Sequence, residues 1–223
     1  MTCTAAPPVW PGPEVQRRIL CLVTDPKAGR GPLPKRVAAA IRGGVDWVQV
    51  RDRSLGGAEL LALLDELRRE AGPSPVRWLV NRRVDVALAG GADGAHLGFD
   101  AMPAAEARVL LGPHAQIGVA THGADELRED EVTRKAVSYA HLAPIYAPLS
   151  KESHRPPLGL EALERAQEVG VPILAQGGIT AARVRGCIAA GAAGVAVTGE
   201  ILAADDPEAA ARALRAALED RDG

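Results

Sequence analysis

The chain alternates between short apolar runs and amphipathic stretches. Eight runs, several rich in β-branched side chains, have the pattern of strands buried on both faces of a parallel sheet. These runs are Ile19–Thr24, Val45–Arg51, Val76–Asn81, Gly94–Gly98, Gln116–Thr121, Val137–Pro144, Pro172–Gln176 and Gly194–Thr198. Helical patterns separate them, and the clearest is Ala58–Glu70, where five leucines fall on one face and the charges on the other. Those leucines are Leu60, Leu61, Leu63, Leu64 and Leu67.

Glycine separates the helical patterns from the strands that follow. It occurs at Gly43-Gly44, Gly90-Gly91, Gly112, Gly170 and Gly191, and glycine just past a helix supplies the left-handed residue that ends it. Eight strand–helix units over roughly 200 residues fit a single (β/α)8 TIM barrel. An open, doubly wound sheet is the alternative. Composition does not change along the chain, so we predict a flexible N-terminal lead-in over residues 1–17 and one barrel domain over residues 18–223.

Composition and charge exclude several classes of function. The 223 residues are 47% hydrophobic and 24% charged, which is typical of a globular protein. A formal net charge of −2 and an aromatic content of 3% argue against a nucleic-acid partner. The sequence has no apolar run long enough to span a membrane and no basic-then-apolar leader, so we expect no membrane association and a cytoplasmic location. Cys3, Cys21 and Cys187 are scattered, which predicts neither a disulfide framework nor a zinc site.

The carboxyl ends of the strands carry the candidate chemistry, because active sites of TIM barrels lie there. After the second strand, alternation places Gln49, Arg51 and Arg53 on one side. Two guanidinium groups suit a phosphorylated ligand, because arginine makes forked contacts with phosphate. The other reading of Arg51 is a surface ion pair with Asp52. The third strand ends in Asn81 and Arg82, which we add to the candidate binding residues.

His122 directly follows the fifth strand and is the candidate catalytic residue. Imidazole titrates near neutral pH and therefore transfers protons readily, although a lone histidine is often structural. Two other histidines are not predicted to act. His114 precedes its strand and belongs to the bottom of the barrel, and His141 lies inside a strand, where core packing is expected.

A long proline-rich loop over residues 144–157 and two glycine turns complete the predicted mouth. Loops of this length are commonly lids or binding loops, and Lys151 in this loop is a candidate phosphate ligand; a solvated lysine is the alternative. Glycine turns after the last two strands leave backbone N–H groups available for a phosphate. The predicted phosphate-binding residues are Gly177, Gly178, Thr198 and Gly199.

Seven stretches in this order resemble the thiamine phosphate synthase/TenI family. They are LVTDP (22–26), GGVDWVQVRDR (43–53), LVNRRVDVALAGGADGAHLG (79–98), IGVATH (117–122), APIYAPLSK (143–151) and LAQGGIT with GAAGVAVTGEI (174–180 and 191–201). A synthase of this family joins a pyrimidine diphosphate to a thiazole phosphate and releases diphosphate. The resemblance implies that Gln49, Arg51, Arg53, Asn81 and Lys151 hold the pyrimidine and its diphosphate. It also implies that the thiazole phosphate binds at Gly178 and at the Thr198–Gly199 turn.

Departures from the family pattern concern the metal. The resemblance implies Mg²⁺ ligands at two aspartates, but Arg82 and Ala101 occupy those positions, and Phe99 replaces a glutamine. Ala120 and Pro148 replace a serine and a threonine. Mg²⁺ requires hard oxygen ligands, so we predict no metal site and no cofactor, with Mg²⁺ relevant only to a synthase.

The lost carboxylates favour the TenI branch, which tautomerises a thiazole carboxylate phosphate. The leading expectation is therefore a proton-transfer enzyme with His122 as acid and base. One alternative is a divergent synthase whose diphosphate is held by Arg82, Arg53 and Lys151. The other is a non-catalytic protein that binds thiazole or thiamine phosphate. The expected partner is a small phosphorylated heterocycle, and self-association is left open.

Overall fold

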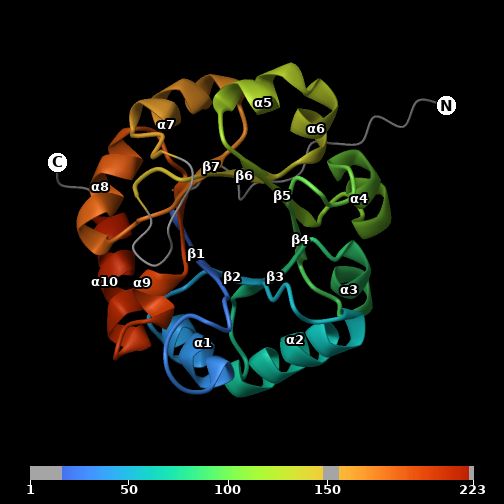
Figure 1. Ribbon diagram of the computed structural model, residues 1–223, viewed down its shortest axis with the longest axis vertical. Helices are drawn as coiled ribbons and strands as arrows, with labels where there is room; N and C mark the ends of the chain where they lie inside the picture. The colour runs from blue at the N-terminus through green and yellow to red at the C-terminus, as the bar shows by residue number, and fades with distance from the viewer. Residues whose placement is uncertain (1–16, 148–155, 221–223) are drawn as a thin grey trace.

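Eight parallel strands form a closed barrel in chain order, β1 to β8 (Figure 1). The computed structural model describes residues 17–147 and 156–220. The strands are β1 Ile19–Val23, β2 Trp47–Val50, β3 Arg77–Asn81, β4 Gly94–Leu97, β5 Gln116–Thr121, β6 Tyr139–Leu142, β7 Ile173–Gln176 and β8 Gly194–Val197. Every predicted apolar run contains one strand, and the closure of β8 on β1 excludes the open sheet. Apart from Arg17, the predicted lead-in lies outside the described residues, so that boundary stays a prediction.

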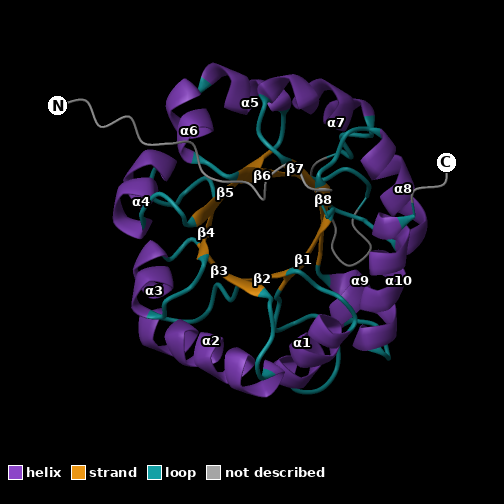
Figure 2. Cartoon of the chain, turned by 180° about the vertical axis from the view of Figure 1, so that it is seen from behind, coloured by secondary structure: helices purple, strands orange, loops and turns teal. Residues whose placement is uncertain are grey.

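Helices surround the barrel and cover the outer faces of its strands (Figures 1 and 2). They are α1 Leu33–Arg42, α2 Gly57–Ala71, α3 Val84–Ala89, α4 Ala104–Leu111, α5 Ala124–Glu129, α6 Glu131–Ala136, α7 Glu161–Ala166, the 3-10 turn η1 Gln167–Val169, α8 Ala181–Ala189, α9 Gly199–Leu202 and α10 Pro207–Glu219. None of the helices in the described ranges is long and apolar enough to cross a membrane.

Helix α2 shows how the sequence pattern becomes packing. The Glu59 carboxylate accepts a hydrogen bond from the Gly56 N–H at 2.8 Å and closes the first turn. Leu60, Leu64 and Leu67 are buried against the barrel, whereas the predicted face was wider. Two of its five leucines, Leu61 and Leu63, are only partly buried.

The barrel interior is filled by layers of four side chains from alternate strands, as expected for this fold. The strand register advances the level by about one residue per strand. From the bottom upward, the layers are Trp47, Gly94, Tyr139 and Gly194; then Cys21, Leu79, Gly118 and Leu174; then Gln49, His96, His141 and Ala196; then Val23, Asn81, Ala120 and Gln176. The lower two layers are mostly apolar, whereas five of the eight residues in the upper two are polar. The polar half of the interior therefore opens toward the carboxyl ends of the strands.

Gly118 leaves room for a large neighbour in this interior. A Cβ atom on Gly118 would lie 2.1 Å from Cζ of Tyr139. We expect Gly118→Ala to lower the free energy of unfolding by about 1–3 kcal/mol, because the ring must move in a packed core. Urea unfolding measures this, with Gly98→Ala as control, because a Cβ there would have its nearest neighbour at 3.5 Å. Equal losses in the two variants would contradict the packing argument.

Candidate active site at the barrel mouth

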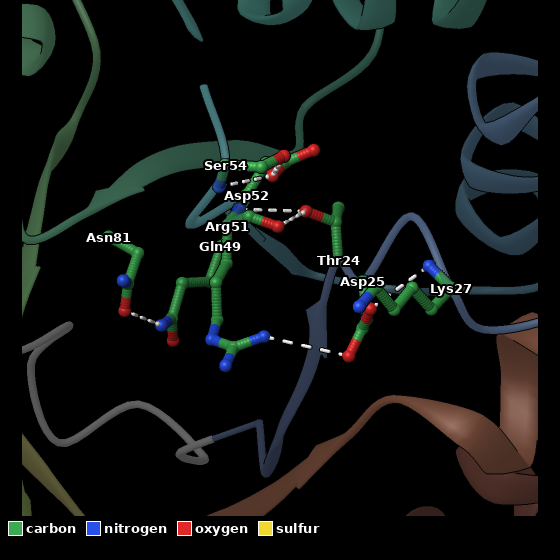
Figure 3. A network of polar contacts seen from close by, with 8 residues as sticks. All are labelled: Thr24, Asp25, Lys27, Gln49, Arg51, Asp52, Ser54 and Asn81. Carbon is green, nitrogen blue, oxygen red and sulfur yellow. Dashed lines mark hydrogen bonds and ion pairs between the residues drawn. The ribbon is translucent and has the colours of Figure 1, made fainter. Parts of the chain in front are cut away.

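Gln49 and Asn81 form a polar pair inside the mouth (Figure 3). Gln49 lies near the carboxyl end of the buried strand β2, and its Nε2 donates to Oδ1 of Asn81 at 2.9 Å. Oε1 of Gln49 is buried and has no hydrogen-bond partner among the described residues. The two predicted binding residues are thus brought together, and one acceptor remains for a ligand.

Arg51 is held by the end of β1 (Figure 3). Oγ1 of Thr24 accepts from the Arg51 N–H at 2.7 Å and donates to the Arg51 carbonyl at 3.0 Å. The Arg51 guanidinium lies 3.6 Å from the Asp25 carboxylate. The predicted alternative, an ion pair with Asp52, does not form, because Asp52 accepts instead from the backbone and hydroxyl of Ser54.

Arg51 and Arg53 place two positive charges near each other, which favours the binding of an anion. Burial and the positive charge of Arg53 lower the pKa of Arg51, and Asp25 and Asp52 oppose this effect. Arg53 itself is exposed at the rim. Like charges held near each other are stabilised by an anion between them, so this side of the mouth is suited to a phosphate or diphosphate.

Arg82 and Asp100 form an ion pair across the ends of β3 and β4. Nη2 of Arg82 lies 2.7 Å from Oδ2 of Asp100. Arg82 is the one non-glycine residue with positive φ in the described chain, at 65°. Such backbone costs about 1–3 kcal/mol and clusters at functional sites. The neighbouring Arg83 turns away and pairs with Asp85 on the surface.

His122 lies at the end of β5 with its ring orientation fixed. Its Nδ1 is 2.9 Å from the carbonyl of Ala143, which accepts only, so Nδ1 carries the proton. In the neutral imidazole, Nε2 then has a lone pair available as a base. The exposed ring of Phe99 packs against His122 at a tilt of 40°, with the centroids 4.6 Å apart. The structure thus gives the predicted catalytic residue one tautomer and an aromatic neighbour.

The predicted phosphate cradle lies at the adjacent ends of β7 and β8. Gly177 and Gly178 have φ of 94° and 61°, and a Cβ on Gly178 would lie 2.4 Å from the Ala147 carbonyl oxygen. Packing of the loop after β6 therefore requires glycine there independently of any ligand. Thr198 and Gly199 begin the short α9 beside this turn.

Arg183, in the first turn of α8, is a residue that sequence reasoning missed. Its Nη1 donates to the Gly178 carbonyl at 2.6 Å, and its guanidinium lies 4.7 Å above the Tyr146 ring. A basic residue one turn after a glycine pair was the available signal. Lys151, the last predicted ligand, lies outside the described residues. A cavity of about 290 Å³ lies at the opposite, amino-terminal end of the strands, beside Trp47 and Arg77, away from this chemistry.

Comparison with known proteins assigns the family. The family model described as "Thiamine monophosphate synthase" matches residues 20–201. The chain belongs to this TMP-TENI family. It is 41% identical over 204 residues to a putative thiamine-phosphate synthase of Geobacter sulfurreducens, covering 91% of this chain and 95% of that protein. It is 40% identical over 205 residues to a thiamine-phosphate synthase of Roseiflexus, covering 90% and 85%.

A solved structure supports the same assignment. The thiamine phosphate pyrophosphorylase of Pyrococcus furiosus superposes with a TM-score of 0.81 at 28% identity, covering 93% of this chain and 98% of that one. The chain is therefore a barrel that belongs to a family of thiamine-biosynthesis enzymes, as the sequence resemblance implied.

The residues of this TMP-TENI chain do not fit the Mg²⁺ site that the family resemblance implies. At the ends of β3 and β4, the carboxylate present is that of Asp100, and the Arg82 guanidinium already binds it. Ala101 packs against the core and offers no ligand. Within the described part of the chain, no group of three or more His, Cys, Asp or Glu side chains could hold a metal ion. An arginine repels the cation that two carboxylates would attract.

Two buried histidines below the mouth make stability depend on pH. Burial lowers the pKa of His141 to about 3, and burial together with His141 lowers the pKa of His96. Both are neutral when folded, whereas in the unfolded chain they gain a proton below about pH 6.5. Their contribution to stability is thus present above pH 6.5 and lost as the pH falls. For His141 the loss is about 1.4 kcal/mol per pH unit in this range.

We expect the free energy of unfolding to fall between pH 7 and pH 5.5, and His141→Leu to reduce that slope. Urea titrations at several pH values measure both. His114→Gln is the control, because it replaces an exposed histidine. Identical slopes for the wild type and His141→Leu would contradict the assignment.

Proposed function

We propose that this chain couples a pyrimidine diphosphate to a thiazole phosphate, forming thiamine phosphate and diphosphate. The relatives at about 40% identity bear the name thiamine-phosphate synthase. The observation that carries the proposal is the set of three arginines at one side of the mouth, Arg51, Arg53 and Arg82. Such a set suits the diphosphate of a substrate and of a leaving group better than it suits a neutral ligand.

The coupling needs charge stabilisation at the departing oxygen. The thiazole nitrogen uses its lone pair to form a bond with the methylene carbon of the pyrimidine. The C–O bond breaks, and its electron pair leaves with diphosphate. Negative charge therefore builds up on the leaving group, where preorganised cationic donors lower the barrier. Arg51 and Arg82 would be those donors, with Arg82 oriented by Asp100.

The residues do not support a step through Mg²⁺, so the proposed coupling proceeds without it. Arg82 stands where the resemblance implies a metal-binding aspartate, and its positive charge takes over part of the neutralisation. Gly177, Gly178, Thr198 and Gly199 remain the proposed site for the thiazole phosphate.

A second candidate function is proton transfer on a thiazole carboxylate phosphate, as in the TenI branch. The orientation of His122 favours it, because the Ala143 carbonyl fixes the proton on Nδ1 and leaves Nε2 as a base. Coupling moves no proton and makes no use of this arrangement.

An end-point assay tests the proposal. Purified protein is mixed with the pyrimidine diphosphate and thiazole phosphate, with excess MgCl₂ or with EDTA, and thiamine phosphate is quantified. The proposal expects product under both conditions. Product with Mg²⁺ alone would overturn the metal-independent mechanism, and no product under either condition would overturn the coupling and leave the proton transfer.

A further inference from the structure

A polar layer crosses the barrel interior below the mouth. It consists of Gln49, His96, His141 and Ala196, one residue from each even-numbered strand. The three polar side chains are almost fully buried, with 3% of Gln49, 4% of His96 and 1% of His141 exposed. The layer beneath is mostly apolar. The polar layer is therefore the floor of the mouth.

Three polar atoms of this floor lack partners among the described residues. Nδ1 of His96 lies 3.2 Å from the Tyr139 hydroxyl, and the His96 ring packs against His141 at a tilt of 35°, with the centroids 4.2 Å apart. However, Oε1 of Gln49 and both ring nitrogens of His141 have no hydrogen-bond partner in the described structure. Buried polar groups are nearly always paired, because an unpaired one loses its bonds to water without compensation. Three such atoms in one layer indicate that a ligand supplies their partners.

The floor is neutral, which limits the ligand. Burial holds the pKa of His141 far below neutrality, and the Gln176 side chain in the layer above opposes this effect without reaching hydrogen-bond geometry. A neutral imidazole has one N–H donor and one acceptor, and Oε1 of Gln49 is an acceptor. An anionic group would lose its hydration here without gaining a positive charge. A neutral ring that offers an amino group with two N–H hydrogens and a ring nitrogen that accepts would satisfy these atoms.

The arginines above the floor determine how a ligand would be oriented in the site. Arg51, Arg53 and Arg82 follow the carboxyl ends of β2 and β3, above the floor. Val23, Asn81, Ala120 and Gln176 form the layer between the floor and the mouth, and two of these side chains are small. A substrate with a neutral ring and an anionic tail would place the ring inward and the tail among the arginines.

We propose that His141 is a specificity-determining residue that, together with Gln49, hydrogen-bonds the amino-substituted nitrogen heterocycle of the diphosphate substrate. The inference rests on the proposed function and adds a residue to it. Sequence reasoning placed His141 in the core, and its position agrees, but packing does not account for its two unpartnered nitrogens. A thiazole ring offers no N–H donor to Gln49, so the floor discriminates between the two substrates.

Calorimetric titration of His141→Leu tests the proposal with two probes, the free aminopyrimidine alcohol and thiazole phosphate. Leucine fills the position in the layer with an apolar side chain and removes both nitrogens. The dissociation constant for the aminopyrimidine should rise about 10- to 100-fold, the consequence of unpaired buried polar groups, while that for thiazole phosphate stays unchanged. His141→Gln should recover part of the affinity, because its amide both donates and accepts.

Leu174→Ala is the matched control, since Leu174 pairs with His141 in the strand register and has no polar atom to lose. It should destabilise the barrel and leave aminopyrimidine binding unchanged. Equal losses of affinity in Leu174→Ala and His141→Leu would reduce His141 to a packing residue and overturn the inference. So would unchanged aminopyrimidine affinity in a folded His141→Leu protein.

The titrations distinguish this inference from the proposed coupling. If the wild type binds the aminopyrimidine through His141 but forms no thiamine phosphate, the recognition stands and the coupling fails. If the wild type forms product and His141→Leu keeps its KM for the pyrimidine diphosphate, the coupling stands and the inference fails.

Discussion

Replacing Arg82 by alanine should lower kcat/KM for thiamine phosphate formation about 100- to 1,000-fold, the typical cost of removing one preorganised donor from a developing charge. The guanidinium is held at 2.7 Å from Asp100, on a backbone with φ of 65°. A side chain fixed in this way loses little entropy when it meets the leaving diphosphate. The effect should fall mainly on kcat, because charge accumulates as the C–O bond breaks. Steady-state kinetics with EDTA present measure it.

Arg83 provides a matched control for Arg82. It is the next residue, carries the same charge and is paired with Asp85 on the surface. Arg83→Ala should therefore leave kcat within about threefold, as expected for a surface substitution outside the site. Arg82→Lys should recover only part of the rate, because an ammonium cannot make the forked contact. Similar losses in Arg82→Ala and Arg83→Ala would indicate a general effect of charge and would remove Arg82 from the mechanism.

Asp100 separates orientation from charge. Asp100→Asn keeps the size of the side chain but removes the ionic partner of Arg82. If the ion pair serves mainly to orient the guanidinium, this variant should lower kcat less than Arg82→Ala does. The Arg82 side chain would be held less firmly, but turnover would not be abolished. A larger loss than that of Arg82→Ala would mean that the carboxylate itself contacts the substrate.

The barrel and the location of its site could be predicted from the sequence, because both depend on period and position. Apolar runs fix where strands lie, and a strand alternates its side chains with a period of two. That rule places Gln49 and Asn81 inward on neighbouring strands; the register pairs Gln49 with Leu79, and its amide reaches Asn81 in the layer above. Glycines after the helices similarly mark where one strand–helix unit ends and the next begins.

Partner choice could not be predicted in the same way. Arg51 contacts Asp25 rather than the adjacent Asp52, because the end of β1 lies beside β2 and the Asp52 side chain turns back to Ser54. Arg82 reaches Asp100 through the positive φ of its own backbone, which no pattern of residue types reveals. His141 shows a further limit: burial is readable from an apolar strand, but whether a buried nitrogen has a partner depends on the three-dimensional layer around it.

Replacing His122 by glutamine should separate the two candidate activities. Coupling transfers no proton, so its rate should change less than about tenfold, the smaller cost of disturbing a neighbouring side chain. Proton transfer on thiazole carboxylate phosphate should fall about 10²- to 10⁴-fold, because glutamine can still donate to the Ala143 carbonyl but has no basic nitrogen. Chromatographic assay of the two thiazole isomers, with deuterium uptake from D₂O, measures the second reaction.

Phe99→Leu tests whether the ring packed against His122 contributes. The two ring centroids lie 4.6 Å apart and the Phe99 ring is otherwise exposed, so its loss leaves the Nδ1 hydrogen bond to Ala143 in place. Proton transfer should then decrease much less in Phe99→Leu than in His122→Gln, because the tautomer is set by the carbonyl rather than by the phenyl ring. Coupling that collapses in His122→Gln would instead place this imidazole against the diphosphate substrate. Two activities that both survive the substitution would leave His122 a structural residue at the end of β5.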